Sequence, residues 1–297
     1  MNTILVPVDY SNACLKALEV ALNLASRLNG QVLLCHIYHP PVFVEAEEDI
    51  EDDPEALAME EAGTKQEALV KLRDFAQLVK ANSPEQVPVG FTVQAGNVVE
   101  ELQKLIKDKA VTMVVLGSRK QTSILNKVFG TTTEKLLKEA TCPVLAVPES
   151  AQSNPFGRVV YATALEPYEE NALRILVQAK NQYNSTIAVL YVENTGLQEA
   201  IDVDGRKKSL LKEFSQQQLI FSQVKSKDVA KGIEDYVQSF NADLVAFTVS
   251  HHTFWQDLFK SSVTSRLLHE LDLPLLAFPI NTPPINFGLA EDREVVP

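Results

Sequence analysis

Short runs of apolar residues alternate along the chain with longer segments in which apolar residues recur every three or four positions. Such short runs are typical of buried strands, and the longer period is typical of amphipathic helices. The runs predict strands in the first half at residues 3–8, 32–37, 91–93, 114–116 and 144–147. They predict strands in the second half at residues 159–163, 186–192, 220–224, 244–248 and 275–278. This alternation predicts an α/β fold with parallel sheets covered by helices on both faces.

Capping and stop signals place helices between these strands. Ser11 is predicted to cap a helix that Asn29-Gly30 ends, since Ser is a good N-cap and Gly a common helix stop. Apolar residues at helical spacing predict further helices around residues 69–79 and 98–106, and another from about Thr131.

The chain repeats itself, with a change of spacing part-way. Residues 4–9 match residues 159–164 at a shift of 155, whereas residues 113–116 and 142–148 match the second half at a shift of 131. The first half therefore holds about 24 additional residues between these regions. The repeat predicts two copies of one doubly wound domain.

We place the two domains at residues 1–150 and 155–280, joined by a polar linker that ends at Pro155. The tail at residues 281–297 either wraps over a neighbouring domain or stays disordered.

Charge is concentrated where the additional residues are expected. The chain has 297 residues and a net charge of −12, and ten acidic residues lie between Glu45 and Glu61 without an intervening Lys or Arg. The acidity disfavours a nucleic-acid surface, which needs clustered Lys and Arg. The acidic segment is interpreted as a solvated loop that runs into a helix starting near Pro54. A cation site or an interaction tail is the alternative, although the Asp/Asn/Gly alternation of a calcium loop is absent.

Cysteine usage and hydropathy suggest a compartment. Cys14, Cys35 and Cys142 are odd in number and widely spaced, which indicates neither a disulfide framework nor a zinc site. No signal peptide and no apolar stretch of ~18 residues are visible. A reduced, cytoplasmic protein without a membrane partner is expected. His36 and His39 have no evident third ligand and are interpreted as core or surface residues.

The loop after the fourth predicted strand carries the main chemical signal. It reads Gly117-Ser118-Arg119-Lys120, then nine residues, then Gly130-Thr131-Thr132-Thr133. A glycine at a strand end lets backbone approach a ligand, and free N–H groups at a helix start favour phosphate. Turn geometry alone would also explain both glycines, and Thr131 with Glu134 has the spacing of a capping box.

Asp9 lies at the end of the first predicted strand. The first and fourth strands of a doubly wound sheet often flank the point where ligands bind. An acid there can accept a hydrogen bond from a ribose hydroxyl. Its alternative role is to cap the following helix, which Ser11 can also do.

Three stretches resemble a universal stress protein domain: residues 4–11, the loop from Gly117 to Thr131, and residues 142–148. The resemblance covers nearly the whole chain as a tandem pair. It implies a five-stranded parallel sheet of order 3-2-1-4-5 in each domain, with helices on both faces. It also implies association through fifth-strand edges, which are the strands at 144–147 and 275–278 here. Burying these edges covers exposed backbone groups.

The nucleotide-binding branch of this family carries Gly-x-x-Gly, nine residues, then Gly and Ser or Thr. The resemblance implies adenine contacts at Val8, Ile37 and Leu116 and a ribose contact at Asp9. It implies phosphate contacts at Gly117, Arg119, Lys120, Gly130, Thr131, Thr132 and Thr133. Lys120 stands where the second glycine belongs. Its side chain would either crowd the phosphates or neutralise them.

The second copy departs from this pattern at four corresponding positions. Asp9 is replaced by Ala164 and Gly117 by Thr248, while His251 and Ser261 replace Lys120 and Gly130. The second copy is therefore predicted to be structural or regulatory rather than nucleotide-binding.

Two classes of function follow. The first is a stress-response protein that binds ATP, with Mg²⁺, or a related adenine nucleotide in its first domain as a regulatory ligand. The second is a nucleotide-independent dimeric scaffold of the same fold. A homo-oligomer and a protein partner of unknown identity are expected in either case. No catalytic constellation is visible, so at most slow ATP hydrolysis is expected.

Overall fold

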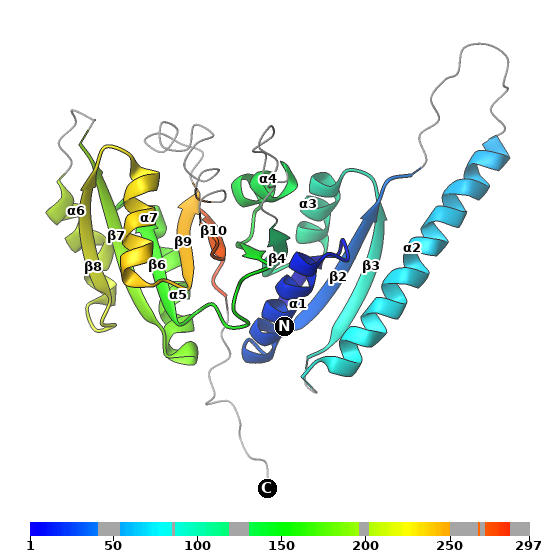
Figure 1. Ribbon diagram of the computed structural model, residues 1–297, viewed down its shortest axis with the longest axis horizontal. Helices are drawn as coiled ribbons and strands as arrows, with labels where there is room; N and C mark the ends of the chain where they lie inside the picture. The colour runs from blue at the N-terminus through cyan, green and yellow to red at the C-terminus, as the bar shows by residue number, and fades with distance from the viewer. Residues whose placement is uncertain are drawn as a thin grey trace, which may run out of the picture.

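The computed structural model describes residues 1–40, 54–84, 87–118, 131–195, 202–249, 267 and 271–285. Its strands form one continuous ten-stranded sheet of order β3-β2-β1-β4-β5-β10-β9-β6-β7-β8 (Figure 1). The first half supplies β1 (Thr3–Pro7), β2 (Gln31–Tyr38), β3 (Val89–Ala95), β4 (Met113–Ser118) and β5 (Val144–Pro148). The second half supplies β6 (Arg158–Thr163), β7 (Thr186–Asn194), β8 (Ile220–Ser226), β9 (Leu244–Val249) and β10 (Leu275–Pro279). All the predicted strands and the order 3-2-1-4-5 in each half are confirmed.

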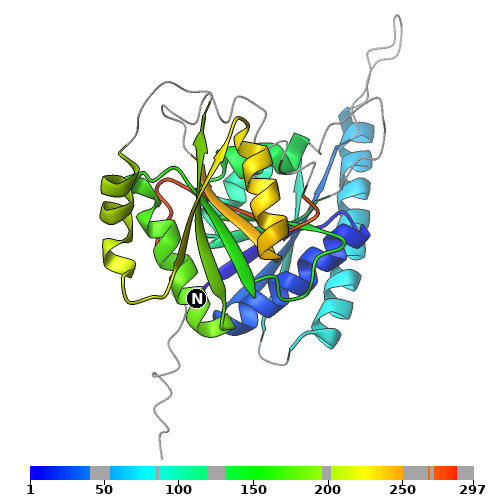
Figure 2. The ribbon, with the colours of Figure 1, turned by 60° about the vertical axis from the view of Figure 1, so that its left-hand side comes forward.

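Helices cover both faces of this sheet. The helices of the first half are α1 (Asn12–Arg27), α2 (Pro54–Asn82), α3 (Val98–Asp108) and α4 (Thr131–Glu139). Those of the second half are α5 (Glu170–Tyr183), α6 (Val203–Leu211) and α7 (Val229–Phe240), with short 3-10 turns η1 (Pro167–Glu169) and η2 (Lys212–Phe214). Side chains of α1, α2, α5 and α6 share one buried cluster, and those of α3, α4 and α7 share the other. In the second half, Figure 2 shows α7 on one side of the strands and α5 and α6 on the other.

The register of the strands follows the sequence repeat. Ile4 of β1 lies opposite Met113 of β4. Val159 of β6 lies opposite Leu244 of β9. These pairs are related by the shifts of 155 and 131 found in the sequence. The central strands therefore pair in the same register in both halves, so the two halves are structural copies.

The additional residues of the first half lie between β2 and β3. The helix there, α2, has 29 residues, whereas its counterpart α6 has 9. Helix α2 begins at Pro54, as the sequence predicts, and Figure 1 shows its N-terminal end projecting beyond the strands. Residues 41–53, which hold most of the acidic segment, lie outside the described residues.

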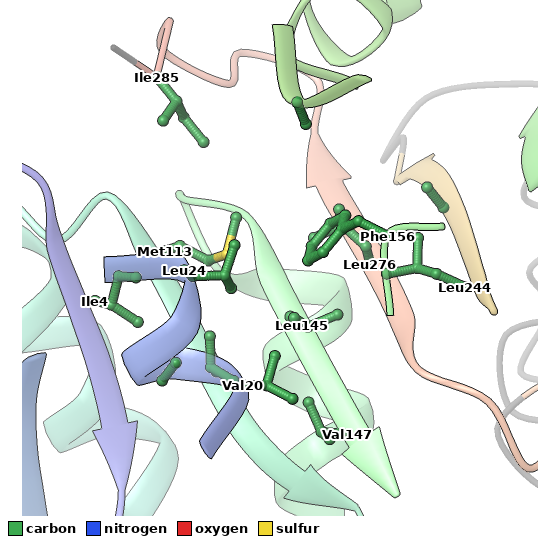
Figure 3. Close-up of a cluster of buried hydrophobic side chains, with 14 of the residues drawn as sticks. Ile4, Val20, Leu24, Met113, Leu145, Val147, Phe156, Leu244, Leu276 and Ile285 are labelled. Carbon is green, nitrogen blue, oxygen red and sulfur yellow. The ribbon is translucent and has the colours of Figure 1, made fainter. Parts of the chain in front are cut away.

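The two halves join through their fifth strands. β5 and β10 pair antiparallel, with Leu145 opposite Leu276. Both leucines are almost fully buried and belong to the hydrophobic cluster that also contains Phe156 and Leu244 (Figure 3). The predicted pairing of these edges is therefore present within one chain. Because both edges are already paired, association of two chains would use other surfaces, and it stays a prediction.

The start of the tail packs against the fold. Thr282 and Ile285 are buried, and Ile285 belongs to the hydrophobic cluster that contains Ile4, Leu24 and Met113 (Figure 3). Thr282 and Ile285 therefore extend the core after β10. The rest of the predicted tail, residues 286–297, lies outside the described residues.

Candidate functional site

The candidate site lies where β1 and β4 end. β1 pairs in parallel with β2 on one side and with β4 on the other. The carboxyl ends of parallel strands meet at one edge of a sheet, and a crevice opens where the strand order reverses. The fold thereby brings together the predicted residues that follow or end these strands. They are Val8, Asp9, Ile37, Leu116 and Gly117.

Only some of the residues predicted to contact the phosphates lie in the part of the chain that the structure describes. Helix α4 begins at Thr131, as predicted, with Thr132 half-buried and Thr133 buried. Glu134 forms an ion pair with Lys138, their nearest N and O atoms 2.6 Å apart. Arg119, Lys120 and Gly130 lie outside the described residues, as do His251 and Ser261 of the second half.

Asp9 is exposed and belongs to the turn that leads into α1. Its Oδ1 accepts hydrogen bonds from the main-chain N–H of Ser11 at 3.0 Å and from the Ser11 hydroxyl at 2.6 Å. Ser11 is the N-cap of α1 and accepts from the N–H of Cys14 at 3.2 Å. Ser11 therefore caps the helix, as predicted, and the Asp9 carboxylate orients the capping residue.

We expect Ser11→Ala to lower the free energy of unfolding by about 1 kcal/mol, because the N–H of Cys14 loses its acceptor. Urea denaturation measures this difference. Ser26→Ala, at an exposed position of the same helix, is the matched control and should change stability by only a few tenths of a kcal/mol. Equal stability of the two variants would contradict the capping role.

Gly117 is required by packing between β4 and α1. A Cβ atom at this position would lie 2.5 Å from the carbonyl carbon of Ala13 and 2.6 Å from the main-chain nitrogen of Cys14. Real Cβ atoms do not approach backbone this closely, so only glycine lets the first turn of α1 rest on β4. The close approach explains this glycine without a ligand, and it fixes the position of the Asp9 turn beside the start of the loop.

An aromatic cluster that sequence reasoning missed holds the same turn. The ring of Tyr10 lies 5.2 Å from that of His36 on β2 and 5.4 Å from that of Phe75 on α2. The Lys71 ammonium lies 4.2 Å from the centre of the Tyr10 ring. His36 also contacts the carbonyl oxygen of Val8 through Nδ1 at 2.8 Å. The residue types gave no signal, because their proximity depends on how α2 packs on β2.

The backbone of this turn is shared by both halves. Tyr10 has a φ of 62° and its counterpart Leu165 a φ of 59°. Neither is a glycine, so the left-handed bend is imposed by the fold, at a cost of order 1 kcal/mol for each residue.

The second half builds the corresponding strand ends differently. Thr248 replaces Gly117, is buried, and its hydroxyl lies 2.7 Å from that of Tyr161. In the first half, Ala13 and Cys14 of α1 lie against Gly117. Their counterparts in the second half, Tyr168 and Glu169, belong to the η1 turn and not to the first turn of α5. The later start of the helix is consistent with a side chain at position 248.

The cysteines lie away from solvent. Cys14, Cys35 and Cys142 are all buried and free of disulfides. Burial raises the pKa of Cys35 and of Cys142 to about 12, so both thiols stay protonated at neutral pH.

Within the described segments, no helix combines the length and the apolar composition needed to cross a bilayer. The described residues also contain no group of three or more His, Cys, Asp or Glu side chains placed to hold a metal ion.

The model of the universal stress protein family matches this chain twice, over residues 1–148 and over residues 155–279. The chain belongs to the universal stress protein family. A universal stress protein of Methanocaldococcus jannaschii is 27% identical over 144 residues, which cover 48% of this chain and 80% of the relative. Another, of Bacillus subtilis, is 27% identical over 148 residues, which cover 49% of this chain and 98% of the relative.

The tandem arrangement also has a counterpart among solved structures. The crystal structure of a universal stress protein from Archaeoglobus fulgidus matches 94% of this chain and 98% of its own, with a TM-score of 0.69 at 17% identity. This likeness shows that both halves together form a tandem universal stress protein fold.

Proposed function

We propose that this universal stress protein binds ATP, or a related adenine nucleotide, in its first half as a regulatory ligand. The observation that carries the proposal is the parallel pairing of β1 with β4. That pairing makes β1, which the exposed Asp9 follows, a direct neighbour of β4, which holds Gly117 near its end. A carboxylate at this edge is suited to accept hydrogen bonds from ribose hydroxyls.

The start of α4 supports the phosphate end of the proposal. A helix that follows a strand through a crossover begins at the edge where the strand ends, so the N-terminus of α4 lies at the same edge as Asp9. The first N–H groups of a helix have no partner within the helix and carry partial positive charge, which favours phosphate. The hydroxyls of Thr131, Thr132 and Thr133 and the cations of Arg119 and Lys120 are further proposed phosphate contacts.

A universal stress protein has been solved in complex with cAMP. The proposal for this chain rests on its own Asp9, Gly117 and α4, and Val8, Ile37 and Leu116 at the strand ends are the proposed adenine contacts.

Calorimetric titration of ATP with Mg²⁺ into the full chain, at fixed salt, tests the proposal. We expect saturable binding at one site per chain. Asp9→Ala should weaken it by about tenfold or more, since a hydrogen bond to a charged group contributes about 1.5–3 kcal/mol. Asp9→Asn keeps an oxygen that can accept from Ser11 while losing the charge, so it should fold normally and show an intermediate loss.

The matched control is Asp235→Ala, which removes an exposed, ion-paired carboxylate from α7 of the other half. Its ATP affinity should equal that of the wild type. Unchanged affinity in Asp9→Ala would place the nucleotide elsewhere. No heat at millimolar ATP would contradict nucleotide binding itself.

The second candidate function is a nucleotide-independent scaffold. The observation that favours it is the sheet itself, which joins both halves by pairing β5 with β10 and buries Leu145 and Leu276 at the joint. Light scattering would then show a stable homo-oligomer at a multiple of 32.9 kDa, with the same mass in the presence and absence of ATP. A mass that changes with ATP would favour the regulatory function.

A further inference from the structure

A buried acidic side chain lies at the end of β6. Glu169, in the η1 turn, is only 1% exposed. At the repeat shift of 155 it corresponds to Cys14, a small buried thiol in the first half. The second half therefore places a charged group where its structural copy has an apolar one, and burial of a carboxylate requires compensating hydrogen bonds.

The loop that follows β6 supplies those bonds. Glu169 Oε1 accepts from the main-chain N–H of Ala164 at 2.9 Å. Its Oε2 accepts from the hydroxyl of Thr163 at 2.5 Å and from the main-chain N–H of Glu166 at 3.3 Å. The N–H of Leu165, between them, donates to the Thr163 hydroxyl at 2.9 Å. Successive N–H groups around a left-handed residue form a concavity that binds anions, and here a carboxylate fills it.

The position of this concavity in the fold is informative. Thr163 and Ala164 correspond to Val8 and Asp9, so the bound carboxylate lies at the strand end that matches the candidate site of the first half. On the neighbouring strand, Thr248 fills the place of Gly117 and bonds to Tyr161. Buried side chains therefore occupy the ends of β6 and β9 in the second half.

We propose that the loop from Thr163 to Glu166 is a carboxyl-binding cradle that the chain occupies with its own Glu169 side chain. Glu169 acts as a built-in ligand, which closes this strand end to external carboxyl groups. Once the side chain is removed beyond Cβ, the cradle takes a small carboxylate such as acetate or formate. This inference is independent of nucleotide binding, because neither the cradle nor its test involves the first half.

Thermal unfolding of Glu169→Ala tests the cradle. Burial raises the pKa of Glu169 to about 7 even though its hydrogen bonds lower it, so the folded loop holds the protonated carboxyl better than the ionised one. The measurements are therefore made at pH 5, where an acetate solution holds both the acid and its anion. The variant should melt below the wild type. Sodium acetate should raise its Tm saturably, by about 3–6 °C at tenfold above the dissociation constant, relative to sodium chloride at equal ionic strength.

Three controls separate specific occupancy from a salt effect. The wild type should respond equally to acetate and chloride, because its cradle is full. Glu213→Ala, which removes an exposed acid of the same half, should do the same. Glu169→Gln keeps the cradle filled with a neutral side chain of the same size, so it should show no acetate response either.

Equal responses of Glu169→Ala to acetate and chloride would overturn the proposal. A wild type that gains as much from acetate as the variant would overturn it too. If Glu169→Ala is unfolded in chloride, recovery of its circular dichroism in acetate supports the cradle, and no recovery at molar acetate contradicts it.

Discussion

Gly117→Ala is expected to lower the free energy of unfolding by about 3 kcal/mol, because its Cβ meets backbone rather than a side chain that can move. The nearest atoms are the carbonyl carbon of Ala13, the nitrogen of Cys14 and the carbonyl oxygen of Ala13, at 2.5, 2.6 and 2.7 Å. The first turn of α1 has to shift, and the Ser11 cap and the Asp9 turn shift with it. Nucleotide affinity should therefore fall together with stability. Guanidinium denaturation and the ATP titration measure the two effects.

Gly63→Ala provides the matched control. Gly63 lies on α2, and a Cβ there would meet no atom within 4 Å. Alanine is the better helix former, so this variant should gain about 0.5–1 kcal/mol. If Gly117→Ala were as stable as the wild type, α1 would not be held against β4 at the distance described, and the geometry of the candidate site would need revision.

The second large effect is a loss of stability as pH rises through neutrality. Burial, only partly offset by the hydrogen bonds from Ala164 and Thr163, raises the pKa of Glu169 from 4.5 to about 7. Between these two values the folded chain holds a proton that the unfolded chain has released. Stability from this group is therefore complete below about pH 4.5 and lost by about pH 7. The expected loss is about 3 kcal/mol for a rise of the pKa from 4.5 to about 7.

Other groups near Glu169 do not reproduce this effect. Tyr161 on β6 is buried, which raises its pKa well above 10, so it stays neutral. Glu166 pairs with Arg206 of α6, the nearest N and O atoms 2.5 Å apart. An Arg stays charged throughout this range.

Glu169→Gln isolates the contribution of the carboxyl group. The variant cannot titrate at this position, so the difference in unfolding free energy between wild type and variant should change by about 3 kcal/mol between pH 5 and pH 8, to the disadvantage of the wild type. Urea denaturation at four pH values across this range measures the difference. Parallel pH profiles of the two proteins would show that Glu169 does not change its protonation in this window.

Much of the fold could be predicted because buried parallel strands leave a strong mark on a sequence. A strand such as β4 or β9 is covered on both faces, so nearly all of its residues are apolar. The repeat shifts then related the two halves residue by residue, and they hold in the register of Ile4 with Met113 and of Val159 with Leu244. The length of α2 was less evident, because polar and charged residues break the apolar pattern before residue 68, and residues 59–63 are all exposed.

The candidate site was predicted in part. Asp9 and Gly117 were found from their place at strand ends, and Ser11 from the preference of Ser for helix N-caps. The sequence left open whether Gly117 serves a ligand or the fold, and its distance to Ala13 shows that packing alone requires it. Contacts that join distant parts of the chain, such as Tyr10 with Phe75 and Lys71, had no local signal.

The amino-acid sequence was enough to predict the elements, their order, the duplication and the family, because these depend on local hydrophobic period and on short motifs. It also showed which residues differ between the copies, but the folded structure was needed to show how the buried groups of the second copy are held. In the sequence, Glu169 is an ordinary acidic residue near the start of a helix. In the structure, its carboxyl group accepts hydrogen bonds from Thr163, Ala164 and Glu166 in the turn around Leu165. Likewise, β5 and β10 meet only because the two edges face each other once the sheets have formed. Burial and hydrogen bonding between separate segments depend on how the elements pack. Residue type and local spacing do not predict that packing.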